Sequence, residues 1–197
     1  MKSDELRNDF NYLVKSHLIP YFNTQKKIIE LFYSYLTQKE EWFEANILLL
    51  FKELENVNII RNFQIEKENI DLYLELNDMK IYCELKHWIG KVRNNKIEKG
   101  KQNPYKLSSY FSKGKDKPNV FYWKDIIKLK NKSKEINTKC YLLIIYQKYE
   151  KETVDEINKS IDNFKSFMKE KDVIIASEKY DQSKNGYMMI LLEVSSV

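Results

Sequence analysis

Two carboxylates and one ammonium group are spaced in this sequence so that they could act on one bound group. Glu84 and Lys86 are separated by one residue in a stretch that alternates apolar and polar side chains, so both point to the same side of a predicted strand. Asp71 lies on the polar side of the preceding strand-like stretch. If these strands pair antiparallel through the turn at Asn77-Asp78, the three side chains meet on one face.

These residue types suit metal-assisted attack on a phosphodiester. Mg²⁺ prefers hard oxygen ligands, which Asp71, Glu84 and the Leu85 carbonyl would supply together with a substrate phosphate. Water bound to the metal is a far better nucleophile than free water. Lys86 would either help to deprotonate that water or offset charge in the transition state, and the sequence leaves these two roles open.

Three helical patterns precede the two strands. Apolar residues recur at helical spacing from Ser3 to Pro20, which we expect to end the first helix. A second pattern follows Thr24, and a third begins at a Thr-x-x-Glu capping box at Thr37 and runs to about Glu55. The N-terminal fifth of the chain is therefore predicted to be helical.

The hydrophobic period then changes from that of helices to that of strands. Short strands at 59–66, 70–76 and 80–87 are separated by polar turns, which predicts a β-meander. Ile70 and the alternating leucines after it are expected on the face opposite Asp71.

The rest of the chain alternates helices and strands. Helices are predicted at 123–136 and 154–168, and strands at 140–146, 173–176 and 187–194. The strand at 140–146 is almost wholly apolar, so we expect both of its faces to be covered. The full order is α-β-β-β-α-β followed by α-β-β.

Length and composition indicate one folded domain. The 197 residues are 43% hydrophobic and 32% charged, with few Gly and Pro. We divide them into a helical extension (1–37), a core (38–147) and a C-terminal helix with strands (148–197). No apolar run approaches the ~20 residues that cross a bilayer, and no secretory signal is visible, so a cytoplasmic location without membrane contact is expected. Cys83 and Cys140 lie in apolar strands, which favours reduced buried thiols over zinc ligands.

Positive charge is concentrated between Lys91 and Val120. This segment has nine Lys or Arg against two acidic residues, whereas the whole chain carries a net charge of +5. Basic side chains interleaved with aromatic ones suit phosphate contact and base stacking, although a merely solvated loop would have the same composition. The residues expected to bind nucleic acid are Lys91, Arg93, Lys96, Lys99, Lys101, Lys106, Lys113 and Lys115.

Asp71 followed on the next strand by Glu84-Leu85-Lys86 resembles the active-site motif of the PD-(D/E)xK nuclease superfamily, which includes restriction endonucleases and resolvases. The resemblance covers residues 40–147 and includes the order of elements. The proline of the family motif is replaced by Ile70, while the carboxylate is retained. The resemblance implies an α/β fold with a restriction-endonuclease-like core, a central mixed sheet flanked by helices, and Mg²⁺ as cofactor, with Mn²⁺ able to substitute.

Members of this superfamily often add an acidic residue from the helix before the meander. We favour Glu44 for this role over Glu40, whose carboxylate a capping box would commit to a backbone N–H. In the helix after the third strand, Asp125 and Lys128 could face the site or the DNA, or belong to a solvated charged face.

The resemblance predicts a Mg²⁺-dependent endonuclease that acts on double-stranded DNA, of a restriction or defence type. Cutting both strands is simplest with two symmetric sites, so we expect a homodimer, with the N-terminal helices as a candidate interface. Three alternatives stay open. The three residues could form only an ion-pair network on an exposed sheet face. The protein could bind nucleic acid without catalysis, or it could be an RNase or a junction-selective nuclease.

Overall fold

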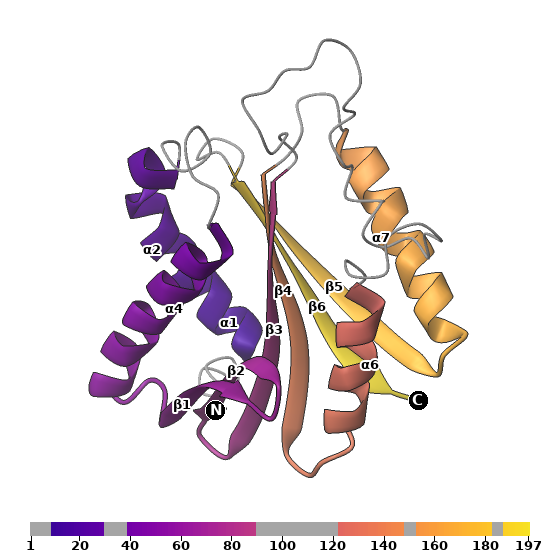
Figure 1. The fold of residues 1–197 in the computed structure, drawn as a ribbon, viewed down its shortest axis with the longest axis horizontal. Coiled ribbons are helices and arrows are strands. Elements are labelled where there is room, and N and C mark those ends of the chain that lie inside the picture. Colours follow the sequence, from indigo (N-terminus) through magenta and orange to yellow (C-terminus); the bar gives the residue numbers. More distant parts are fainter. Residues whose placement is uncertain (1–8, 30–38, 90–121, 148–152, 183–186) are drawn as a thin grey trace, which may run out of the picture.

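The computed structural model forms a six-stranded mixed sheet with helices on both faces (Figure 1). This architecture confirms the α/β class. The predicted nucleic-acid-binding residues and Thr37 of the expected capping box lie outside the described part of the chain. The described residues are 9–29, 39–89, 122–147, 153–182 and 187–197.

One continuous helical segment begins the described chain. It comprises α1 (Phe10–Leu13), the π-helical turn η2 (Val14–Leu18) and α2 (Ile19–Thr24). Our prediction that Pro20 ends this helix was wrong. The Ile19 N–H donates to the Val14 carbonyl five residues back, so the helix is wide just before the proline ring.

Helix α4 (Lys39–Asn56) follows, and its C-terminal end lies one residue beyond the predicted one. Its buried side chains recur at helical spacing and face the sheet; they are Phe43, Ile47, Leu50, Phe51 and Leu54. After α4 the backbone N–H groups of Ile59 and Ile60 donate to the Leu54 carbonyl. These two residues close the helix end, which explains why the first strand begins three residues later than predicted.

The six strands lie in the order β1-β2-β3-β4-β6-β5. The β3 and β4 strands run parallel, and the other neighbouring pairs are antiparallel. The predicted meander is confirmed as β1, β2 and β3. The strand bounds are β1 Asn62–Lys67, β2 Ile70–Leu76, β3 Met79–Ile89, β4 Thr138–Gln147, β5 Val173–Gln182 and β6 Tyr187–Ser196.

Helices α6 (Tyr122–Lys132) and α7 (Val154–Lys169) cover the other face of the sheet (Figure 1). α6 ends four residues before its predicted end, because the chain turns there with Asn137 at φ 54° and Ile136 is 86% exposed. The helix was predicted to extend to Ile136 because this residue is apolar. α7 starts at a capping box between Thr153 and Glu156.

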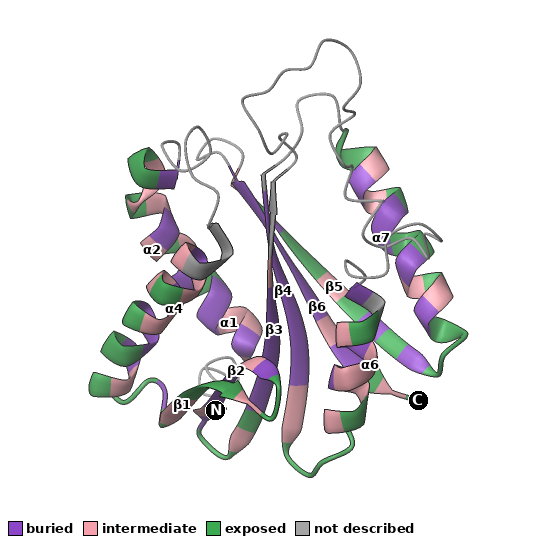
Figure 2. Cartoon of the chain, in the orientation of Figure 1, coloured by how far each residue is buried: buried purple, intermediate pink, exposed green. Residues whose placement is uncertain are grey.

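Each face of the sheet has its own apolar cluster. Buried residues run along the central strands and along one side of the helices that flank them (Figure 2). The N-terminal cluster lies under α1, η2, α2 and α4, and the C-terminal cluster lies under α6 and α7. β4 contributes Leu143 to the first and Leu142 to the second, which confirms that it is covered on both faces. Cys83 and Cys140 are buried and free, as predicted. In α1, η2 and α2 the buried side chains are Phe10, Leu13, Val14, Leu18 and Phe22, and Ile19 and Tyr21 are partly buried.

Candidate active site

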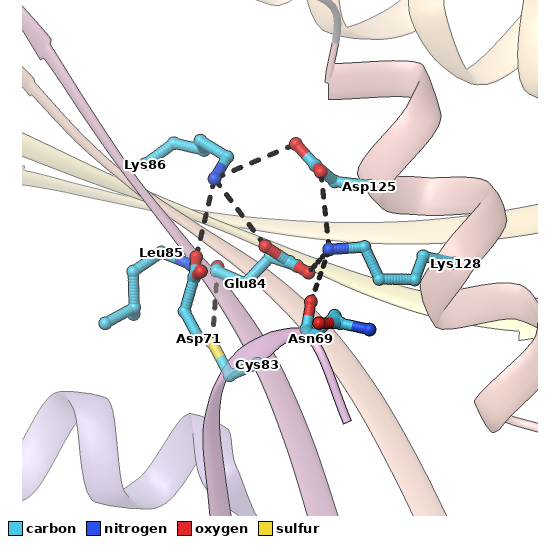
Figure 3. Close-up of polar contacts among 8 residues, drawn as sticks. All are labelled: Asn69, Asp71, Cys83, Glu84, Leu85, Lys86, Asp125 and Lys128. Carbon is cyan, nitrogen blue, oxygen red and sulfur yellow. Dashed lines mark hydrogen bonds and ion pairs between the residues drawn. The ribbon is translucent and has the colours of Figure 1, made fainter. Parts of the chain in front are cut away.

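The site lies where β2 separates from β3. The last pair between these strands is Leu72 with Cys83, while β3 continues beside β4 as far as Ile89. At this point a side chain takes the place of the missing backbone partner: the Leu85 N–H donates to Asp71 Oδ2 at 2.8 Å (Figure 3). This hydrogen bond fixes Asp71, at the start of β2, against β3.

Ile70 corrects one prediction made for β2. It packs in the C-terminal cluster, whereas Leu72 and Leu74 lie in the N-terminal cluster. Asp71 is paired with no residue in the strand ladders that join β2 to β1 and to β3. Glu66, the residue of β1 that lies opposite Asp71, has a positive φ of 51°. The regular alternation of side chains is therefore interrupted at the residue that carries the carboxylate.

The structure brings Asp71, Glu84 and Lys86 together. Lys86 Nζ lies 3.4 Å from Asp71 Oδ2 and 3.6 Å from Glu84 Oε2 (Figure 3). Glu84 and Lys86 point to the same side of β3 because they are two residues apart in a strand. The ammonium group is thus held between the two carboxylates.

Helix α6 adds two charged residues from its first and second turns. Lys86 Nζ lies 3.8 Å from Asp125 Oδ2, and Lys128 donates a hydrogen bond to Glu84 Oε1. Lys128 Nζ also lies 3.8 Å from Asp125 Oδ1 and donates to the Asn69 carbonyl at 2.7 Å. The sequence left open whether Asp125 and Lys128 face the site, the DNA or solvent, and in the structure both face the site.

The sequence pattern held a partial signal for this placement. Asp125 and Lys128 each directly precede a fully buried residue, Ile126 and Leu129. A polar residue next to the buried stripe of an amphipathic helix lies at the boundary with the sheet. The pattern alone does not say which strand residues this boundary meets.

The charged groups are withdrawn from solvent to different extents. The Glu84 side chain is 1% exposed, and Asp71, Lys86 and Asp125 are partly buried. This differs from an ion-pair network on an open sheet face, because α6 covers the carboxylate of Glu84. Three carboxyl groups meet two ammonium groups here.

Burial, together with the charge of Asp71, raises the pKa of Glu84 to about 7, although the hydrogen bond from Lys128 acts in the opposite direction. Burial also raises the pKa of Asp125, against the opposing effect of Lys86 and Lys128. Ionised carboxyl groups are costly to bury, and such perturbed groups cluster at functional sites.

Glu44 approaches the site from the other face of the sheet. A small hollow is lined by Phe43, Glu44, Ile47, Leu85, Lys86, Leu143 and Ile145. Glu44 of α4 and Lys86 of β3 both border this hollow, and a role for Glu44 at the site stays a prediction. The side chain of its rival Glu40 lies outside the described residues.

The residues present fit a hard divalent cation. Asp71 and Glu84 offer carboxylate oxygens, and the Leu85 carbonyl lies on the same strand edge as the Leu85 N–H that bonds Asp71. Across the described ranges, no three His, Cys, Asp or Glu side chains form a metal-binding group. Two carboxylates and a carbonyl suit Mg²⁺, which keeps several of its waters, and a dication would offset the negative charge near Glu84.

Among the helices that the structure describes, none is long and apolar enough to cross a membrane. Comparisons of the chain with protein-family models, with curated proteins and with solved structures found no match.

Proposed function

We propose that this protein is a Mg²⁺-dependent phosphodiesterase that cuts DNA and has a restriction-endonuclease-like core. The observation that carries the proposal is the convergence of Asp71, Glu84 and Lys86 where β2 separates from β3. The element order α4-β1-β2-β3-α6-β4 supports the same conclusion, because it corresponds to the core expected from the family resemblance. A homodimer of restriction or defence type remains part of this proposal.

Each residue has a defined task in this proposal. Asp71, Glu84 and the Leu85 carbonyl would hold Mg²⁺, which when bound supplies Lewis-acid polarisation and a more acidic water. The Lys86 ammonium is held within 3.8 Å of three carboxyl groups, so it is fixed before substrate arrives. There it can stabilise negative charge that develops on a phosphate.

The choice of DNA rests on the distribution of charge along the chain. β3 ends at Ile89, three residues after Lys86, and the basic segment that begins at Lys91 follows directly. Lys and Arg side chains bind the phosphates of nucleic acids, so a basic segment that directly follows the strand of the site in sequence favours a nucleic-acid substrate.

The test is cleavage of supercoiled plasmid, single-stranded DNA and RNA by the purified protein, with Mg²⁺ and with EDTA. We expect cutting of DNA with Mg²⁺ alone, and its loss in Glu84→Ala and Lys86→Ala. Lys134→Met serves as a control, since it removes one charge from an exposed residue after α6. Preferred cutting of RNA would favour the RNase alternative. Binding of DNA without cutting by any form of the protein would favour a non-catalytic binding protein.

A further inference from the structure

The two oxygens of Glu84 have different partners. Oε1 accepts a hydrogen bond from Lys128 on α6, whereas Oε2 lies 3.6 Å from Lys86 on the side of Asp71 (Figure 3). A carboxylate on a flexible glutamate can present either oxygen to a bound ion. Here the contact with Lys128 breaks that symmetry, because it holds one oxygen away from Asp71 and leaves the other beside it.

Lys128 is itself held by three elements of the fold. It donates to the Asn69 carbonyl at 2.7 Å, it pairs with Asp125 at 3.8 Å within α6, and it contacts Glu84 of β3. Asn69 directly precedes β2 and lies two residues before Asp71. One ammonium group therefore connects the carboxylate of Glu84 to the chain segment that carries Asp71.

We infer that Lys128 is a positioning residue that holds Glu84 Oε1, so that Oε2 stays on the side of Asp71 and can bind the metal ion there. This inference rests on the proposed function, because it assigns Lys128 a part in building the same Mg²⁺ site. Lys128 acts through Glu84 and makes no contact with the metal. Hydrogen-bond partners of metal ligands fix the orientation of those ligands, and their loss costs about 10–100-fold in metal affinity or activity.

A purely structural role for Lys128 makes a different prediction. If Lys128 only anchored α6 to β2 and β3, its removal would lower stability without changing how the folded protein binds Mg²⁺. A competing role makes a third prediction: if Lys128 occupied the place of the metal on Glu84, its removal would tighten Mg²⁺ binding. The direction of the change in Mg²⁺ affinity therefore separates the three roles.

The experiment compares wild type, Lys128→Gln, Lys128→Met and Lys128→Arg as full chains. Calorimetric titration with Mg²⁺ in the absence of DNA measures binding directly, and the Mg²⁺ dependence of plasmid cutting gives the half-saturating concentration and the rate at saturation. Thermal unfolding identifies variants that are folded at the assay temperature. Lys134→Met, which removes an exposed charge next to α6, is the matched control.

We expect Lys128→Met and Lys128→Gln to bind Mg²⁺ about 10–100-fold more weakly, with a smaller loss of rate at saturating Mg²⁺. Lys128→Arg keeps a charged donor, so its Mg²⁺ affinity should stay close to that of the wild type. Lys134→Met should have the same Mg²⁺ affinity as the wild type. Unchanged or tighter binding by folded Lys128→Gln would overturn the inference while leaving the proposed function intact. Absence of Mg²⁺ binding by the wild type would overturn both.

Discussion

The two faces of the sheet use burial for different purposes. The N-terminal cluster is a continuous apolar surface between the sheet and the helices α1, η2, α2 and α4. On the opposite face the C-terminal cluster is equally well buried, but the charged groups around Glu84 interrupt it at the start of α6. Within the described ranges, the two polar residues classed as buried, Glu84 and Ser160, both lie on this second face.

This difference shows where the fold tolerates a cost in stability. Burying apolar side chains stabilises the chain by roughly 25 cal/mol per Å² removed from water. Burying a carboxylate costs free energy that its partners only partly offset. Among the described residues, no charged side chain is buried on the N-terminal face, where the Tyr141 hydroxyl donates to partly exposed Asp9 at 2.9 Å. The buried charge on the other face is therefore explained better by function than by stability.

The prediction with the largest expected effect removes one negative charge from the site and compares the result with the same change on the N-terminal face. Asp71→Asn keeps an oxygen that can accept the Leu85 N–H bond but removes the negative charge, so we expect DNA cutting to fall by about 10³-fold, which corresponds to about 4 kcal/mol in the barrier. The matched control is Asp9→Asn, which alters a hydrogen-bonded carboxylate on the N-terminal face. Initial rates at saturating Mg²⁺ measure both variants. Equal cutting rates for Asp71→Asn and Asp9→Asn would contradict a role for Asp71 in cutting.

The second prediction concerns the N-terminal cluster, where a substitution should lower stability and leave the cutting rate almost unchanged. Phe10 is fully buried, and its ring centroid lies 5.0 Å from that of Tyr141. Phe10→Ala should lower the free energy of unfolding by about 3–4 kcal/mol, because it removes buried surface and leaves a cavity. Denaturant unfolding measures the loss. The cutting rate per folded molecule at low temperature should stay within a few-fold of wild type, and a loss as large as that of Asp71→Asn would mean that the two faces are not independent.

The smallest expected effect concerns the stability cost of the buried carboxyl. Burial and the charge of Asp71 raise the pKa of Glu84 from an ordinary 4.5 to about 7, so the folded state binds this proton more tightly than the unfolded state. The stability contributed by this group is therefore present below about pH 4.5 and is lost as the pH rises to about 7. Without metal, the wild type should lose up to about 3 kcal/mol relative to Glu84→Gln across this range.

Denaturant unfolding of both proteins in EDTA at several pH values tests this prediction. The comparison with Glu84→Gln removes the contribution of groups that titrate equally in the two proteins. A difference that stays constant with pH, or that changes with the opposite sign, would contradict the assigned cause. Saturating Mg²⁺ should reduce the difference for the wild type, because a ligand that binds only the folded state stabilises it.

The sequence by itself determined the features that depend on local periodicity. Alternation along a strand fixes Glu84 and Lys86 on one side of β3, and the helical period of α4 fixes which of its residues face the sheet. The order of helices and strands follows from the same two periods, as does the burial of both thiols. Each of these properties is set by residues a few positions apart, which is why it can be predicted from a single chain.

The tertiary structure decided the features that depend on distant partners. The interrupted alternation at Ile70 arises where the ladders on both sides of β2 omit Asp71. The contact between Lys128 and Glu84 joins residues 44 positions apart, and it exists only because α6 packs against β3. No local pattern specifies such a pairing, because the free energy that selects it comes from docking a whole helix against the sheet.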